Sequence, residues 1–236
     1  MTRFSTIFAV LLMGISILLA DLTIMEHVKI VTDMGLAAIN LTGVIIAIFV
    51  GIGLVSKEIE RRTVYTIMAR PISRAEFILG KYLGLSLTLL VNMLIMLVVF
   101  SLMLSVYRAP VHGALLQAIE LIFVELLVVT ALALFFSSFS SSATLSAIMT
   151  IGFYVVGHVT ADLKGLAEKG QNTAAKMITT VLYYVCPNLE VLNIKGQASA
   201  GSPVSLFYET MASFYGLLYA ALLLTAACLV FQRRDF

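Results

Sequence analysis

The sequence has few charged residues, and this scarcity excludes most classes of soluble protein. Only 12% of its 236 residues are Asp, Glu, Lys or Arg, against about 25% in a typical soluble domain. Hydrophobic side chains make up 61% of the chain, and the mean hydropathy is +1.04. We therefore interpret the chain as an integral membrane protein that is surrounded by a lipid bilayer.

Catalytic motifs and cysteine pairs are also lacking. No HExxH, GxSxG, Walker A or CxxC pattern occurs, so intramembrane hydrolysis and nucleotide binding lose their usual signatures. The net charge of only +2 gives no reason to expect nucleic-acid binding. Cys186 falls in a polar loop and Cys228 in the last apolar run, and we expect both thiols to be free. We expect no enzyme activity, cofactor or metal in this chain.

Six apolar segments are long enough to cross a bilayer. They cover about residues 4–20, 34–55, 79–106, 114–136, 143–159 and 211–231. No soluble domain fits between them, so we predict one all-α transmembrane domain over residues 1–236. The first segment follows directly on Met1-Thr2-Arg3 and has no small-residue cleavage pattern, so we interpret it as a spanning helix.

Basic residues indicate how these segments are oriented. Nine Lys and Arg fall on one side, at Arg3, within residues 57–81 and at Arg233 and Arg234, against six on the other side. Because basic loops are retained in the cytoplasm, we predict that both termini are cytoplasmic. The long loop at residues 160–210 then lies outside.

The stretch from Lys57 to Lys81 is the one long polar interruption of the apolar segments, and it holds six of the fifteen basic residues. Glu58 stands three and four residues before Arg61 and Arg62, a spacing that favours ion pairs on one helix face. We expect a solvated helix that extends from the second span into the cytoplasm. We refer to residues 57–81 as the elbow.

A proline and a capping box give the elbow its turn. Pro71 should end the first helix at about Arg70, because proline disfavours helical geometry in the residue before it. Ser73-Arg74-Ala75-Glu76 has the capping-box pattern, so a second helix should begin there. No proline follows until after Tyr107, and this helix would be about 50 Å long, against a hydrocarbon core of about 30 Å. The elbow is therefore predicted to be rigid.

The outer loop contains a short amphipathic pattern. Apolar residues recur on one helical face between Met177 and Val185, until Cys186-Pro187-Asn188 stops the run. This helix is too short to span, so we expect it to lie in the membrane interface or to re-enter the bilayer. It could cover a translocation path or simply anchor the loop.

The fourth segment carries two carboxylates, Glu120 and Glu125, which are costly in a bilayer unless they face water or a partner. They stand about 140° apart around the helix and so do not form a pair on it. Each could line a path, or could belong to packing or reach the interface by snorkelling. Asn92 on the third segment favours an interhelical hydrogen bond. We expect all three histidines, His27, His112 and His158, near the outer surface.

Methionine and glycine patterns in the apolar segments have plain packing explanations. Met93, Met96 and Met103 lie along one helix, as in a copper(I) path, but neither Cys nor His joins them in sequence, which favours packing. Gly80 and Gly84 have the spacing that lets helices approach closely in lipid.

The elbow and the chain end resemble those of a known family. The run from Lys57 to Thr63, then Arg70-Pro71-Ile72-Ser73-Arg74, is similar to the first cytoplasmic loop of type-2 ABC exporter permeases. The ending Arg233-Arg234-Asp235-Phe236 and the segment Pro187-Asn188-Leu189-Glu190 also resemble that family. In one departure, only three residues precede the first span, where such permeases usually have an amphipathic surface helix.

The resemblance implies a six-helix half-transporter in a prokaryotic inner membrane. It implies a second copy of this or a related permease, and a separate cytoplasmic ATP-binding cassette ATPase that carries ATP and Mg²⁺. The elbow then corresponds to the coupling helix that docks on the ATPase. The residues expected to act there are Glu58, Glu60, Arg61, Arg62, Thr63, Pro71, Ser73 and Arg74.

Two other functions compete with ATP-driven export. In the permease, Glu120, Glu125 and Asn92 are the residues expected to line the translocation path. An ion-coupled secondary transporter would instead use Glu120 and Glu125 as proton sites. Against it, the sequence shows no pair of broken helices at matching positions in its two halves. A membrane anchor without transport activity would need only the elbow. We favour the permease, and no motif identifies its substrate.

Overall fold

The computed structural model describes residues 10, 14, 27–60, 73–106, 113–140, 142–160 and 173–232. Every regular element in these ranges is a helix, as predicted. The elements are α2 (His27–Glu60), α4 (Arg74–Val106), α5 (Gly113–Phe139), α6 (Ala143–His158), α8 (Thr173–Val185), the 3₁₀ turn η1 (Glu190–Leu192), α9 (Lys195–Ser199) and α10 (Leu206–Gln232).

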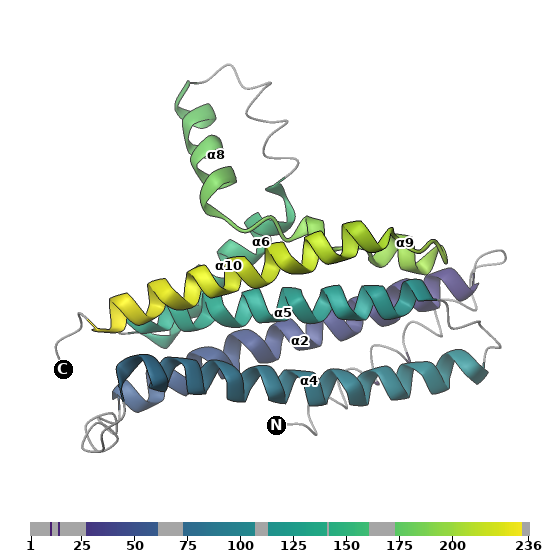
Figure 1. The fold of residues 1–236 in the computed structure, drawn as a ribbon, viewed down its shortest axis with the longest axis horizontal. Coiled ribbons are helices and arrows are strands. Elements are labelled where there is room, and N and C mark those ends of the chain that lie inside the picture. Colours follow the sequence, from purple (N-terminus) through teal and green to yellow (C-terminus); the bar gives the residue numbers. More distant parts are fainter. Residues whose placement is uncertain are drawn as a thin grey trace.

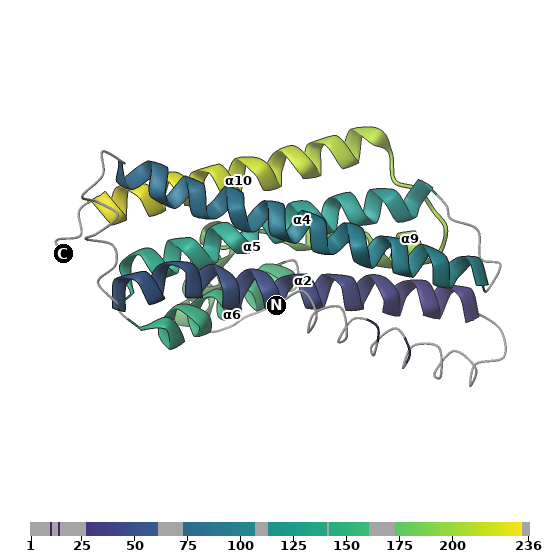
Figure 2. The ribbon, with the colours of Figure 1, turned by 90° about the horizontal axis from the view of Figure 1, so that it is seen from below.

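Helix α5 is the centre of the bundle. It packs against α10, α2, α4 and α6, and Figure 1 shows α10, α5, α2 and α4 as layers with nearly aligned axes. The view from below places α6 beside α2 and α5 (Figure 2). Apolar side chains occur on all faces of α5, and most of them are buried. A helix with no polar face is stable only when other apolar groups enclose it.

Four helices are long and apolar enough to cross a membrane: Val28–Leu54, Arg74–Ser105, Gly113–Phe139 and Leu206–Gln232. The predicted span at residues 143–159 is present as α6, but its 16 residues reach only about 24 Å, less than the hydrocarbon core. The predicted span at residues 4–20 lies outside the described residues apart from Val10 and Gly14. The count of six spans therefore stays a prediction.

Helix ends differ from the predicted spans where polar residues continue a helix. The predicted second span begins at Met34 and the sixth at Met211, whereas α2 begins at His27 and α10 at Leu206. Apolar runs mark the part of a helix that suits hydrocarbon, and the helix itself can extend into the polar interface. The predicted fourth span ends at residue 136, whereas α5 continues to Phe139.

Helix α4 lies at the edge of the bundle and exposes much of its apolar surface. A Cβ added at Gly80 or Gly84 would have no atom of the described residues within 4 Å, so these glycines do not pack against another of the described helices. Their side of α4 faces outward. Met93 and Met96 are 5% and 4% exposed in the apolar core, as expected of packing residues.

The predicted outer-loop helix is present as α8, but the chain enters the core only after it. Cys186, Leu189 and Leu192 are buried, and burial raises the pKa of the Cys186 thiol. The Leu189 N–H donates to the Gly157 carbonyl at 3.0 Å. Gly157 permits this approach, since a Cβ there would lie 2.8 Å from the Pro187 carbonyl oxygen. Figure 1 shows α8 projecting from the bundle.

Candidate functional site

Glu125 lies near the middle of α5 with an exposed fraction of 0%. The Asn40 side-chain amide on α2 donates to its Oε1 and Oε2 atoms at 3.3 and 3.1 Å. Asn40 is itself only 2% exposed. A carboxyl group in apolar surroundings is unfavourable unless such donors replace water. These two residues thus connect α2 to α5 inside the bundle.

His158 approaches Glu125 from the last turn of α6. Its Nδ1 lies 3.1 Å from the Tyr154 carbonyl oxygen, and because a carbonyl only accepts, Nδ1 carries a hydrogen. Its Nε2 lies 3.4 Å from Glu125 Oε1. The two groups form an ion pair only when the imidazole is protonated, and Nε2 is buried with no hydrogen-bond partner among the described residues.

The Glu125 centre, defined here as Asn40, Glu125, Tyr154 and His158, therefore joins three helices. The Tyr154 and His158 rings lie 4.6 Å apart. The Oδ1 atom of Asn40 is buried and has no hydrogen-bond partner among the described residues. His158, which we predicted near the outer surface, contacts Glu125 in the middle of α5, and its side chain is 21% exposed.

Glu120 belongs to a separate polar cluster near the start of α10. The Ser213 hydroxyl donates to Glu120 Oε1 at 3.3 Å. Gln117 donates to Glu209 Oε2 at 2.7 Å and to the Val204 carbonyl at 3.1 Å. Its own oxygen accepts from the Val204 N–H at 3.1 Å. This cluster fixes the first turn of α10 on α5.

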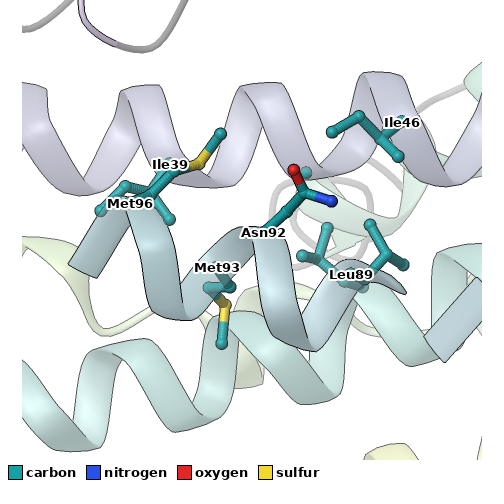
Figure 3. Close-up of a pocket in the computed structure, with 8 residues that line it drawn as sticks. Ile39, Ile46, Leu89, Asn92, Met93 and Met96 are labelled. Atoms are coloured by element: carbon teal, nitrogen blue, oxygen red, sulfur yellow. The ribbon is translucent and has the colours of Figure 1, made fainter. Parts of the chain in front are cut away.

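Asn92 lies apart from both carboxylates. Its side-chain amide donates to the Thr88 carbonyl of its own helix at 2.8 Å. Together with Gly43, Met93 and Leu126 it borders a cavity of about 10 Å³ between α2, α4 and α5, roughly the room that one water molecule needs. Figure 3 shows Asn92 between Ile39 and Ile46. The three predicted path residues thus fall into three separate clusters.

The capping box predicted within the elbow is present. The Ser73 N–H donates to Glu76 Oε2 at 2.8 Å, and the Glu76 N–H donates to Ser73 Oγ at 3.2 Å. Helix α4 begins at Arg74 as predicted. Of the other predicted coupling residues, Glu58 and Glu60 lie in the last turns of α2. Arg61, Arg62, Thr63 and Pro71 lie outside the described residues.

A family model described as ABC-2 family transporter protein matches residues 5–236, nearly the whole chain. The chain belongs to this family. A comparison with curated proteins found no match. ABC-2 membership and four apolar helices of membrane-spanning length make the chain a multi-pass membrane permease. Permeases of this family are generally transport subunits without enzyme activity, and they typically act with an ABC ATPase.

Sequence reasoning misses three of the buried polar partners in this ABC-2 permease. Asn40 falls inside an apolar span, His158 is predicted at the surface, and Glu209 falls in the predicted outer loop. The amphipathic spacing of Tyr154 and His158 on one face of α6 is the available signal. In the part of the chain that the structure describes, no three His, Cys, Asp or Glu side chains gather as a metal site requires.

Proposed function

We propose that this chain is the transmembrane subunit of an ABC exporter in a prokaryotic inner membrane. A separate cytoplasmic ATPase supplies the energy, and two permease copies, each with cytoplasmic termini, form the path. The observation that carries the proposal, within the family assignment, is the capped start of α4. Its 33 residues reach about 50 Å, so part of α4 projects beyond the bilayer next to the basic elbow.

A projecting helix with a fixed start suits mechanical coupling. A moving ATPase can displace a helix only through a contact that does not bend, and the capping box at Ser73 and Glu76 stiffens this end. The predicted contacts to the ATPase are the elbow residues, of which Glu58 and Arg62 are the most informative charges. Charge complementarity favours docking, and reversal of one charge opposes it.

The test is reconstitution of the chain with its partner ATPase, sought first among the neighbouring genes. We expect the two proteins to co-purify, and Glu58→Arg and Arg62→Glu to weaken this binding or to uncouple ATP hydrolysis. Glu190→Arg, on η1 in the outer loop, is the matched control and should bind normally. Wild-type binding and permease-dependent ATP hydrolysis in both elbow variants would refute the role of the elbow. No ATPase binding by the wild-type chain would refute the proposed function.

The Glu125 centre favours a second candidate, a proton-coupled transporter. Glu125 Oε1 and His158 Nε2 lie 3.4 Å apart, and two titratable side chains in contact inside a membrane protein are what such a mechanism needs. Proteoliposomes that contain this chain alone, with a pH-sensitive dye inside, distinguish the candidates. The permease should leave an imposed pH gradient intact. Collapse of the gradient in wild type but not in Glu125→Gln would favour the proton-coupled mechanism.

A further inference from the structure

The first turn of α4 is fastened to the last turn of α10. Arg74 Nη1 donates to the Gln232 carbonyl at 2.9 Å and to the Phe231 carbonyl at 3.2 Å. Carbonyl groups in the last turn of a helix lack partners within that helix and carry partial negative charge. The Arg74 guanidinium group supplies these carbonyls with hydrogen-bond donors and with a positive charge. Arg74 is the residue directly after the capping Ser73, so this contact lies within the elbow, at the start of α4.

An aromatic contact reinforces the same join. The rings of Phe77 on α4 and Phe231 on α10 are stacked, with centroids 5.7 Å apart and planes 12° apart. Lys81 Nζ lies 5.4 Å from the Phe77 centroid, in the range of a cation–π contact. Phe231 is fully buried. We name Arg74, Phe77, Phe231 and the Gln232 carbonyl the α4–α10 seam.

The seam is a local connection and not part of a continuous helix interface. Beyond it, an open apolar groove of about 480 Å³ separates α4 from α10, lined by residues such as Leu79, Thr225 and Cys228. Helix α10 packs far more extensively against α5 than against α4. Figure 2 shows α4 and α10 converging toward the chain's C-terminal end. Force on the start of α4 can therefore reach α10 at this point.

Close packing joins α10 in turn to the centre of the bundle. Gly216 of α10 lies so close to α5 that a Cβ there would be 2.4 Å from Val124 Cγ1. Val124 is the neighbour of Glu125 in sequence. Packed helices move as rigid bodies or slide by small steps, because their cores resist compression. A displacement of α10 would therefore act on α5 at the Glu125 centre.

We propose that the α4–α10 seam transmits movement of the elbow to α10, so that Arg74, Phe77 and Phe231 are positioning residues of the transport cycle. This inference rests on the proposed function. The ATPase would push the elbow, the seam would carry α10 along with α4, and α10 would shift against α5. A seam that served stability alone would lower the unfolding temperature when weakened, but would leave the nucleotide-driven movement of α10 unchanged.

The experiment measures that movement directly in the complex of permease and ATPase in lipid nanodiscs. Spin labels are attached at Phe49→Cys on α2 and Leu222→Cys on α10, positions that are 60% and 59% exposed. Cys186→Ser and Cys228→Ser remove the native thiols, and unlabelled subunits dilute the labelled ones. Electron–electron resonance gives the label distance without nucleotide and with ATP trapped by vanadate. We expect the distance distribution of the wild-type complex to shift on trapping.

Seam variants should lose this shift. Phe231→Leu removes the ring stack from the α10 side, outside the elbow, and should lose the shift while the complex still binds and hydrolyses ATP. Arg74→Gln removes the guanidinium donors, and Phe77→Leu removes the ring stack but leaves the backbone contacts, so it serves if Arg74→Gln does not fold. Arg74→Lys and Phe77→Tyr should retain the shift. Phe214→Leu, at the other end of α10 and 65% exposed, is the matched control and should behave as wild type.

Three results would overturn the inference. A wild-type shift in all three seam variants would show that the elbow moves α10 by another route or not at all. Absence of any shift in a wild-type complex that hydrolyses ATP would show that α10 does not move. Loss of ATPase binding in Phe231→Leu, which lies outside the elbow, would make the seam part of the docking site. Failure of the wild-type chain to bind the ATPase is a different result, which refutes the proposed function first.

Discussion

The Glu125 centre and the capped start of α4 are both held by hydrogen bonds to a carboxylate, but they differ in access to water. The hydrogen bond to the carboxylate is shorter at α4: the Ser73 N–H lies 2.8 Å from Glu76 Oε2, whereas the Asn40 amide lies 3.1 and 3.3 Å from the Glu125 oxygens. Ser73 and Glu76 are exposed, whereas Glu125 is 0% exposed. Water can replace a lost partner at α4 but not inside α5.

We therefore expect the burial of a hydrogen bond, more than its length, to decide how much stability its loss costs. A buried polar group that loses its partner costs several times more than an exposed one. Substitutions in the Glu125 centre should therefore lower the free energy of unfolding strongly, whereas substitutions at the start of α4 should lower it little. The following predictions test this difference from its largest expected effect to its smallest.

Replacement of Glu125 by leucine should have the largest effect. Asn40 and His158 would then lose their shared partner, and removal of one member of a buried polar pair costs about 3–5 kcal/mol. Denaturant unfolding in detergent micelles measures the change. Glu125→Gln, which keeps an acceptor for Asn40, should cost much less. Equal stability of Glu125→Leu and wild type would show that the buried polar contacts of Glu125 do not stabilise the fold.

Addition of a methyl group at Gly216 should come next. A Cβ there would meet Val124 Cγ1 at 2.4 Å, and overpacking of this kind costs about 1–3 kcal/mol. Gly84→Ala on exposed α4 is the matched control, because no described atom lies within 4 Å of its Cβ position. It should stabilise the helix by up to about 1 kcal/mol. The same unfolding assay would show opposite signs for the two variants, and a shared sign would contradict the prediction.

Truncation of Gln117 should have an intermediate effect. Gln117→Ala removes the contacts to Glu209 and to both backbone groups of Val204, which we expect to cost about 1.5 kcal/mol in this half-buried place. Hydrogen exchange should speed up in the first turns of α10. Gln197→Ala, at an exposed position of α9, is the control and should leave exchange in the first turns of α10 unchanged. An unchanged exchange rate in Gln117→Ala would show that the cluster does not hold α10.

Ser73→Ala should have the smallest effect on stability. Loss of an exposed N-cap costs about 1 kcal/mol, confined to the first turn of α4. Faster hydrogen exchange at the Glu76 and Phe77 amides would reveal it, with global unfolding nearly unchanged. Glu76→Gln can preserve the capping box and serves as the control. A global loss of stability as large as that of Glu125→Leu would remove the distinction between the two regions.

The sequence predicted the helices well and their partners poorly. Apolar runs located α2, α4, α5, α6 and α10, since a membrane span needs such a run whatever it packs against. The partners of Glu125 could not be predicted, because Asn40 is 85 residues away and depends on how α2 is rotated against α5. Helices that are apolar on all sides give no pattern that fixes this rotation.

The sequence by itself determined the membrane environment, the helical class and the start of α4 at Ser73, because each depends on composition or on contacts between residues three apart. Only the tertiary structure decided that α5 is enclosed while α4 faces outward, and that Arg74 meets carbonyls 157 and 158 residues along the chain. The physical reason is that long-range contacts arise when several helices exclude one another from the same space, and no single segment contains that information.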